Sequence, residues 1–361
     1  MCSARDKNMI KGHGGNIYEM AGALGCSPWE ILDMSSNVSP LGMAPGLKAV
    51  LGKSWNEIIA LPEVDSRDLR AHFAVSKGLA KDQVLAGNGT TELIYMIPPA
   101  LKVKKALIVG PTYSDYEGAC QAYGIQPTFC LAREEANFQP SLDEVSSRLA
   151  DVDTVFICNP NNPTGQRIPI QSLRTLIGAH PGVRFVVDES YLPFVPNWEA
   201  ESLVGAAENV IVLQSFSKIF AIPGLRLGFL IAAPEVINAF RPFKQPWSVN
   251  RLAQVAGTFL VSQESFVQEV ADFVQKERDT FLGYLEGIGP LCPFPSHVHF
   301  ILFKLNEDLK APELFRLMAE HKILIRDCSN FHGLSNRFFR IALKTPEANK
   351  ACADILRKVL A

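Results

Sequence analysis

Three kinds of signal are missing from this chain, and each absence excludes a class of protein. No run of eighteen apolar residues occurs, and the N-terminus has no apolar core of signal-peptide length, so we expect neither a membrane span nor secretion. The 35 basic and 37 acidic residues are well mixed and leave a net charge of −2, which offers no basic field for nucleic acid or an anionic membrane. The expected partner is therefore a small molecule.

Cysteine spacing excludes two further classes. The eight cysteines are scattered, and none belongs to a C-x-x-C pair. This usage argues against a disulfide framework and against a zinc site, and it predicts a reduced, cytoplasmic protein that holds no metal. Cys158 lies within an apolar run, as a buried free thiol would.

Short apolar runs alternate with helix-like segments between about residues 83 and 230. Runs at 104–110, 154–160, 184–190, 210–215 and 225–232 each end in Gly, Pro, Asn, Asp, Ser or Ala and are predicted to be strands. Their apolarity is continuous rather than alternating, which indicates a sheet covered on both faces. Segments such as 141–150 and 169–180, with apolar residues three and four apart, are predicted to be the covering helices. The fold class is therefore α/β with a mainly parallel sheet.

The pattern changes after about residue 245. One long helical tract covers 251–288, and strand-like runs at 297–305, 323–328 and 337–343 alternate with helical segments at 311–321 and 347–360. We therefore expect three parts: an N-terminal segment over 1–37 that packs with the small domain and the site, a large ligand-binding domain over 38–245, and a small α+β domain over 246–361. The distinctive polar residues follow the predicted strands, at the edge where open α/β sheets bind ligands.

Lys218 in "QSFSKIFAIPGLRLGF" lies between an apolar strand and an apolar turn. A lysine partly removed from water has a lowered pKa and can attack an aldehyde to form a Schiff base. Ser215, Ser217 and Arg226 lie close by in the sequence and could bind a phosphate. The alternative is a lysine and an arginine at a strand edge that point to solvent.

Three other stretches offer groups for the same ligand. Asp188 ends an apolar strand, so its charge needs a buried cation, and Tyr191 follows three residues later; the alternative is a carboxylate that caps the next turn. Asn162 lies in the rigid turn "CNPNNPTG", although such turns also occur without any function. The stretch "GNGTTE" begins an apolar helix, where backbone N–H groups attract an anion, or where the threonines and Glu92 only cap the helix.

The order of these stretches from residue 86 to 228 is phosphate turn, aromatic residue, N-P-T-G, D-x-x-Y, S-x-S-K and R-x-G. It resembles the fold-type I pyridoxal-phosphate enzymes, the aspartate aminotransferase superfamily. The resemblance implies pyridoxal 5'-phosphate as cofactor and a sheet of the seven-stranded type in the large domain. It also implies that Lys218 carries the cofactor as a Schiff base and that Asp188 keeps the ring nitrogen protonated; these are the two catalytic residues.

The same resemblance assigns the remaining cofactor contacts. Asn162 and Tyr191 would bond the phenolic oxygen of the ring, and Tyr113 of "GPTYSDY" would stack on its face unless it is only a packed core aromatic. The cofactor phosphate would be held by Gly89, Thr90, Thr91, Ser215, Ser217 and Arg226.

Flanking sequence is similar to one branch of this superfamily, the threonine-phosphate decarboxylases, over about residues 11 to 350. The similar stretches include "HGGNIYEMAGALGCSPWEILDMSSNVSPLGM", "LPEVDSRDLR", "PWSVN" and "ILIRDCSNFHGLSNRFFRIAL". Those enzymes convert L-threonine O-3-phosphate to (R)-1-aminopropan-2-yl phosphate and CO2 for the nucleotide-loop linker of cobalamin. Histidinol-phosphate aminotransferases are the alternative branch, and L-serine O-phosphate, which would give ethanolamine phosphate, is an alternative substrate.

Carried over residue by residue, this resemblance implies a set of substrate contacts. His13 of "KGHGGNIY" and Asn37 would meet the substrate phosphate together with Arg326, while Arg340 would bind the carboxylate and Asn162 would also face the substrate. His13 could instead lie in a solvated leader, and the arginines could be exposed strand charges. The same resemblance implies a homodimer with the active site at the interface.

This chain departs from its relatives at three positions. Leu61 stands where a tyrosine usually reaches the cofactor phosphate of the neighbouring subunit. His299 replaces a usual asparagine, and Ser66 replaces a common aromatic residue. The choice between threonine phosphate and serine phosphate, and the group that orients the scissile carboxylate, stay open at this point.

Overall fold

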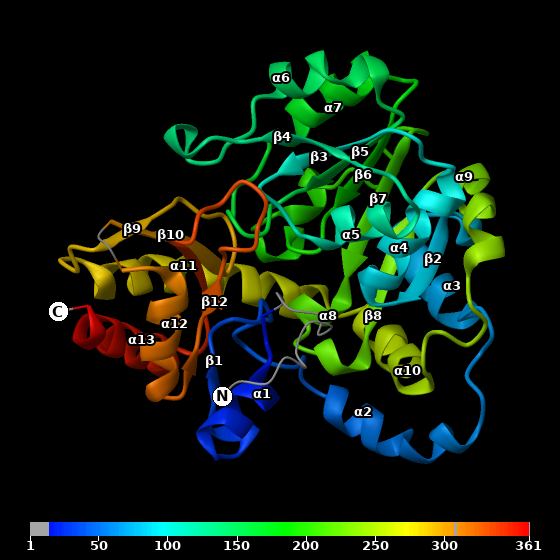
Figure 1. The fold of residues 1–361 in the computed structure, drawn as a ribbon. Coiled ribbons are helices and arrows are strands. Elements are labelled where there is room, and N and C mark those ends of the chain that lie inside the picture. The colour runs from blue at the N-terminus through cyan, green and yellow to red at the C-terminus, as the bar shows by residue number, and fades with distance from the viewer. Residues whose placement is uncertain (1–13, 307–308, 361) are drawn as a thin grey trace.

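The computed structural model describes residues 14–306 and 309–360. A seven-stranded sheet forms the centre of the large domain, in the order β2-β8-β7-β6-β5-β3-β4 (Figure 1). Its strands are β2 (Val84–Asn88), β3 (Ala106–Gly110), β4 (Thr128–Leu131), β5 (Thr154–Cys158), β6 (Arg184–Asp188), β7 (Val210–Ser215) and β8 (Leu227–Ile231). All neighbouring pairs from β4 to β7 are parallel, and β8 runs antiparallel to both β7 and β2. The predicted α/β fold with a mainly parallel sheet is confirmed.

Helices cover this sheet on both faces. Side chains alternate along a strand, so in β6 Val186 joins one apolar core while Phe185 and Val187 join the other. Because both faces are buried, every position of these strands can be apolar, which explains the continuous runs in the sequence.

The helices that accompany the large sheet come before, between and after its strands in the sequence. Their bounds are α2 (Leu47–Lys53), α3 (Arg67–Ser76), α4 (Gly89–Leu101), α5 (Asp115–Ala122), α6 (Leu142–Ser147), α7 (Ile170–Ala179), α8 (Phe216–Ile219), α9 (Pro234–Phe240) and α10 (Arg251–Leu260). The predicted helices at 141–150 and 169–180 correspond to α6 and α7. Among the described residues, no helix is both long enough and apolar enough to span a membrane.

A second, antiparallel sheet of four strands forms the small domain, in the order β12-β13-β10-β9. Its strands are β9 (Leu291–Pro293), β10 (Phe300–Leu305), β12 (Arg326–Asp327) and β13 (Phe338–Ala342). Three helices share a core with these strands: α11 (Glu264–Leu285), α12 (Ala311–Glu320) and α13 (Pro346–Val359).

The structure differs from the sequence prediction in two segments near this domain. The tract 251–288 forms two helices, because the chain turns at 261–263 so that α10 can pack on α2 and α3 while α11 continues towards α13. The run 323–328 forms two short strands rather than one. Its first part, β11 (Ile323–Leu324), pairs in parallel with β1 (Leu32–Asp33), and its second part, β12, pairs with β13.

The N-terminal segment reaches the small domain through this β1–β11 pair. Helix α1 (Ile17–Leu24) precedes it (Figure 1). Met20, Ala21 and Ile31 pack against Leu324. The segment that follows β1 therefore leaves the small domain close to Arg326. The expected domain boundaries at 37 and 245 stay predictions.

Candidate active site

A cavity of about 570 Å³ opens where the two domains and the N-terminal segment meet. The carboxyl ends of β5, β6 and β7 form its floor, the beginning of α4 forms one side, and β12 and β13 form another. Thirteen of the fifteen site residues predicted from the sequence line it: Asn37, Gly89, Thr90, Thr91, Tyr113, Asn162, Asp188, Tyr191, Ser215, Lys218, Arg226, Arg326 and Arg340.

Two predicted residues are not among the lining residues. Ser217 is buried, and its hydroxyl is used by the backbone of Leu227, donating to the carbonyl oxygen at 3.2 Å and accepting from the N–H at 3.3 Å. The structure therefore gives Ser217 a role in joining α8 to β8 rather than in facing the cavity. His13 lies outside the described residues.

Lys218 follows β7 on the short helix α8 and is half-buried, with its side chain at the cavity wall. Burial lowers its pKa to about 8, and the positive charges of Arg226 and Arg340 add to this effect, while Asp188 opposes it. Roughly a tenth of the Lys218 side chains are therefore free amines at pH 7, far more than at the ordinary lysine pKa of about 10.4. A free amine is the form that attacks an aldehyde.

Asp188 ends β6, and both of its carboxylate oxygens accept a hydrogen bond. The hydroxyl of Tyr116 donates to Oδ2 at 2.7 Å, and the backbone N–H of Ser190 donates to Oδ1 at 2.9 Å. Burial raises the pKa of Asp188, and these donors act in the opposite direction. The carboxylate retains lone pairs for a cationic ligand.

The beginning of α4 and the loop before β8 form an anion cup. Gly89 has φ of 74°, and a Cβ at this position would collide with the guanidinium of Arg226. Gly228 allows a second close approach, because a Cβ there would lie 2.7 Å from the backbone nitrogen of Thr90. Arg226 itself has φ of 59°, a conformation that costs energy for a residue with a side chain and is common at functional sites.

Glu92 supplies the cap of this helix. Its carboxylate accepts from the backbone N–H of Asn88 at 2.6 Å and from the ammonium of Lys244 at 2.9 Å. The threonines are therefore not required for capping. Thr90 and Thr91 line the cavity, beside the positive end of the helix dipole.

Two hydrogen-bonded pairs of polar side chains also line the cavity: Asn37 with Tyr191, and Arg340 with Asn162. The amide nitrogen of Asn37 donates to the Tyr191 hydroxyl at 3.2 Å, so the hydroxyl hydrogen remains available to a ligand. Arg340 donates to the side-chain oxygen of Asn162 and, at 2.8 Å, to the backbone oxygen of Ser35. Among the described residues, Arg340 Nε and Asn37 Oδ1 are buried without a hydrogen-bond partner.

Arg326 lies beside Arg340 in the small-domain sheet. Its guanidinium donates to Asn330 at 2.7 Å and lies 5.1 Å from the ring centroid of Phe331. Burial lowers the pKa of both guanidinium groups, which nevertheless stay charged. Two buried cations on one wall create a strong preference for an anionic ligand.

Several lining residues were missed in the sequence. Tyr116, in the same "GPTYSDY" stretch as Tyr113, binds Asp188, and the second aromatic residue of that stretch was the available signal. Asp33 accepts from the Ser35 hydroxyl at 2.7 Å, and Ser35 in turn accepts from the Gly15 N–H at 2.7 Å. This chain of bonds ties the N-terminal segment to the cavity wall, and a D-x-S turn in "LDMSS" is the pattern that signals it.

The three positions that depart from the resemblance lie in different surroundings. Leu61 is 74% exposed. Ser66 is buried with φ of 53°, and its hydroxyl accepts from Gln254 at 3.1 Å. His299 is fully buried and stacks on Phe194 at 3.7 Å, and neither ring nitrogen has a partner among the described residues.

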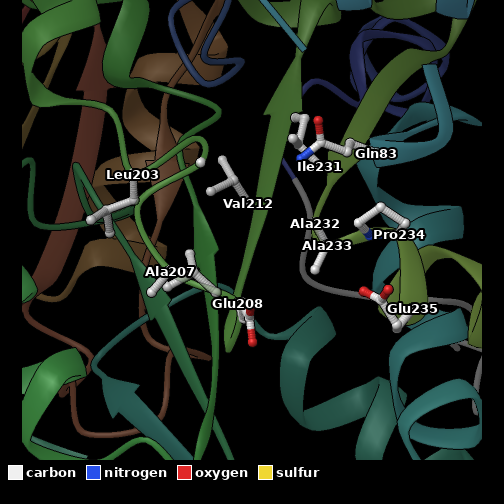
Figure 2. A pocket seen from close by; sticks show the side chains of 12 residues that line it. Gln83, Leu203, Ala207, Glu208, Val212, Ile231, Ala232, Ala233, Pro234 and Glu235 are labelled. Atoms are coloured by element: carbon white, nitrogen blue, oxygen red, sulfur yellow. The ribbon is translucent and has the colours of Figure 1, made fainter. Parts of the chain in front are cut away.

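A second hollow, of about 400 Å³, lies at the other end of the central strands, where β7 begins. Figure 2 shows the loop with Ala207 and Glu208 on one side of it and residues 232–235 on the other. Its described lining includes two carboxylates and no cation or hydroxyl. It therefore lacks the groups that a phosphate or an aldehyde requires. Among the described residues, no group of three or more His, Cys, Asp or Glu side chains is arranged to hold a metal ion.

The geometry of the large cavity fits an anionic aldehyde with a basic ring. It offers an amine, a buried carboxylate and an anion cup. The Ser190 hydroxyl and Arg340 Nε, which have no hydrogen-bond partner among the residues that the structure describes, lie at its wall. The sequence pattern of one family, "Aminotransferase class I and II", matches residues 47–356 of this chain. The chain belongs to the aminotransferase class I and II family. Enzymes of this family depend on pyridoxal phosphate.

Individual members of the family align over almost the whole chain. The threonine-phosphate decarboxylase of Salmonella typhimurium is 33% identical, with 96% of each chain covered. The adenosylcobalamin biosynthesis bifunctional protein CobDQ of Leptospira interrogans is 32% identical over 96% of this chain, which spans only 41% of that longer protein.

Solved structures of two family members superpose closely. The L-threonine-O-3-phosphate decarboxylase of Porphyromonas gingivalis has a TM-score of 0.82 at 29% identity, covering 91% of this chain and 98% of that one. The histidinol-phosphate aminotransferase of Clostridium acetobutylicum has a TM-score of 0.84 at 27% identity, with the same coverage. Backbone similarity alone therefore does not separate the two activities.

Proposed function

We propose that the protein is a pyridoxal-phosphate-dependent decarboxylase of an O-phospho-amino acid, with L-threonine O-3-phosphate as substrate and (R)-1-aminopropan-2-yl phosphate and CO2 as products. The observation that carries the proposal is the presence of Arg326 and Arg340 on one wall of the cavity that contains Lys218. A substrate with a carboxylate and a phosphate gives each guanidinium an anion. The 33% identity to a threonine-phosphate decarboxylase supports the same reading.

The cofactor would be held by three groups of residues. Lys218 offers its amine, Asp188 offers a carboxylate to the ring nitrogen, and the anion cup offers Gly89, Thr90, Thr91, Ser215 and Arg226 to the phosphate. Tyr191 and Asn162 offer hydrogen-bond donors, since the Tyr191 hydrogen and the Asn162 amide nitrogen are not used by the bonds that position their oxygens. Bound there, pyridoxal phosphate supplies an electron sink for the bond that breaks at the α-carbon of an amino acid.

Arg340 would select that bond. Its guanidinium is fixed by Asn162 and Ser35, so a carboxylate that it binds is held at one angle to the ring. The bond held perpendicular to the ring plane overlaps its π system and weakens, so orientation is the catalytic decision. When CO2 leaves, the electron pair stays with the α-carbon. Lys218 Nζ, with its pKa lowered to about 8, then supplies the proton that replaces the carboxylate.

Arg326 would receive the substrate phosphate. Asn330 and Phe331 fix its guanidinium beside the mouth of the cavity, which the segment 14–18 borders. The two arginines would then bind opposite ends of one substrate. The distance between them would therefore select the length of the substrate. His13 and Asn37 remain proposed contacts of the same phosphate.

The alternative is a histidinol-phosphate-type aminotransferase, favoured by the TM-score of 0.84 to such an enzyme. That substrate carries a phosphate but no carboxylate on its α-carbon, so it would leave one of the two guanidinium groups without an anion. Serine phosphate is an alternative substrate of the decarboxylase, because one methyl group is worth only about 1–3 kcal/mol in a pocket. A role in making the cobalamin linker is supported by the name of the Leptospira relative.

A homodimer is the proposed assembly. Trp55, Ile58, Ile59, Leu61 and Val64 are all more than half exposed and lie within ten residues of one another, which forms an apolar surface of the kind that subunit contacts bury. Light scattering on the full chain tests this proposal, and a monomer at micromolar concentration would contradict it.

A substrate panel tests the proposed activity. The purified protein, loaded with pyridoxal phosphate, is incubated with threonine phosphate, serine phosphate and histidinol phosphate, each with and without 2-oxoglutarate. We expect CO2 and a phosphorylated amino alcohol, identified by mass, without any requirement for 2-oxoglutarate. Product formation that depends on 2-oxoglutarate, without CO2, would establish the aminotransferase instead.

A further inference from the structure

Tyr116 connects two parts of the large sheet that are not adjacent. It is the second residue of α5, which follows β3, whereas its hydroxyl donates to Asp188 Oδ2 on β6 at 2.7 Å. Strand β5 lies between β3 and β6, and the Tyr116 ring crosses it, stacked on Phe156 with centroids 5.6 Å apart and planes at 21°. The side chain is 1% exposed, so packing fixes it in this position.

We propose that Tyr116 is the positioning residue that holds the Asp188 carboxylate ionised and aimed at the ring nitrogen of the cofactor. The inference rests on the proposed function, because the ring nitrogen belongs to pyridoxal phosphate. Tyr116 would not touch the cofactor. It would act through Asp188, by setting the charge and the rotamer of that carboxylate.

The hydrogen bonds of Asp188 support this role. An ionised carboxylate has about four acceptor positions, and the structure fills one on each oxygen, with Ser190 N–H on Oδ1 and Tyr116 O–H on Oδ2. Ser190 belongs to the same turn as Asp188 and follows any movement of it. Tyr116 comes from helix α5, which is distant from this turn in the sequence. Of the two donors, only Tyr116 therefore fixes the carboxylate relative to the rest of the cavity.

The chemistry of the tyrosine makes it a dependable donor. Burial, followed by the charge of Asp188, raises its pKa well above 10, so the hydroxyl keeps its proton at any physiological pH. Burial also raises the pKa of Asp188, whereas a donor to the charged form lowers it. The thiol of Cys158, which also lies beside Tyr116, donates instead to the backbone oxygen of Pro160 at 3.3 Å. The hydroxyl proton is thus left for Asp188.

The test compares two ligands that differ only at the ring nitrogen. Apo-protein of the full chain is titrated with pyridoxal 5'-phosphate and with its 1-deaza analogue, which has carbon in place of that nitrogen, and binding is followed by quenching of tryptophan fluorescence. The variants are Tyr116→Phe and, as a matched control, Tyr123→Phe, whose side chain is 52% exposed. We expect Tyr116→Phe to weaken binding of pyridoxal phosphate about tenfold, the size of one hydrogen bond to a charged group, and to leave the analogue within about twofold.

A double-mutant cycle gives a second readout. In an Asp188→Asn background, Tyr116→Phe should no longer affect the affinity for pyridoxal phosphate, because there is no carboxylate to hold ionised. In the protein that retains Asp188, Tyr116→Phe should raise the pKa of Asp188. The affinity for pyridoxal phosphate should then begin to fall at a higher pH than in the unsubstituted protein. Circular dichroism confirms that each variant is folded.

The outcomes separate this inference from the proposed function. Equal losses for both ligands, or an unchanged effect in the Asp188→Asn background, would show that Tyr116 only packs, and the inference would be overturned while the proposed function stands. Failure of the unsubstituted protein to bind pyridoxal phosphate would overturn the proposed function and this inference together.

Discussion

Arg326 and Arg340 stand directly opposite each other on the adjacent antiparallel strands β12 and β13. Opposite residues project from the same face of a sheet, and like charges in that position repel each other. The contact between the two charges is therefore unfavourable by itself. Burial lowers the pKa of Arg340, and the charge of Arg326 adds to this effect. A ligand with two negative groups relieves this repulsion, which is why the pair points to an anionic amino acid.

Arg340→Lys should separate carboxylate binding from cofactor binding. A lysine keeps the charge but cannot hold a carboxylate through two parallel bonds, so we expect a loss of about 2–4 kcal/mol, or roughly 30- to 1,000-fold in kcat/KM. Steady-state CO2 release measures it. Arg316→Lys on the exposed side of α12 serves as the control and should leave the rate unchanged. A similar rate in both variants would contradict the role of Arg340.

Arg326→Gln should weaken the hold on the substrate phosphate. We expect a rise of about 10- to 100-fold in KM for threonine phosphate, with little change in cofactor affinity, because the residue lies in the small domain, away from the anion cup. Inhibition by inorganic phosphate should weaken in parallel. If the affinity for pyridoxal phosphate falls instead, the assignment of the two phosphates is wrong.

Gly89→Ala should damage the anion cup. The new Cβ would strike the Arg226 guanidinium, and its φ of 74° disfavours alanine as well. Gly124→Ala is a matched control, since Gly124 has φ of 73° but no atom of the described part of the chain lies within 4 Å of an added Cβ. Both variants should lose about 1 kcal/mol of stability from backbone strain, whereas only Gly89→Ala should lose tenfold or more in affinity for pyridoxal phosphate. Fluorescence titration and thermal unfolding measure the two effects.

The reaction of apo-protein with pyridoxal phosphate should depend on pH through Lys218. Only the unprotonated amine attacks the aldehyde, and its pKa is lowered to about 8. The rate of imine formation should therefore rise with pH and level off above about 8, rather than above the ordinary lysine pKa of about 10.4. Stopped-flow absorbance follows the reaction. Lys218→Ala should remove the absorbance band, and a midpoint near 10 would show that the amine is solvated.

His299 should make the fold sensitive to acid. Burial, with Lys344 nearby, holds its pKa well below 6.5, so below pH 6.5 the unfolded chain binds a proton that the folded chain does not. The contribution of His299 to stability is therefore lost as pH falls, by about 1.4 kcal/mol per unit below 6.5. The free energy of unfolding, measured with denaturant between pH 5 and 7, should depend less steeply on pH in His299→Asn than in the unsubstituted protein. Parallel curves for the two proteins would mean that the histidine becomes charged within the fold.

Much of the fold could be predicted because strands buried on both faces leave an unambiguous pattern. The runs that became β3, β5, β6, β7 and β8 were all recognised. Strand β4 was not, because it lies at the edge of the sheet and only one of its four residues, Cys130, is buried. The turn at 261–263 was missed for a different reason: helical periodicity continues across it, and only the partners of α10 and α11 require a bend.

The site shows the same division. Residues that follow strands, such as Asp188 and Lys218, could be predicted because parallel strands end at one edge. Tyr116 was missed because its partner Asp188 lies 72 positions away in the sequence. Asp33 was missed because the D-x-S turn signals its bond with Ser35 but not the bond that Ser35 accepts from Gly15. Ser217 was assigned to the cofactor phosphate on its place in the sequence, yet its hydroxyl is used within the protein by Leu227.

The reversed direction of β8 has a consequence for how the chain reaches its native state. Gly89 and Arg226 are 137 positions apart in the sequence, and they meet only once β2 has paired with β8 and β8 with β7. Contacts between such distant segments form late in folding. Capture of pyridoxal phosphate during refolding should therefore report closure of this edge of the sheet, after the parallel core has assembled.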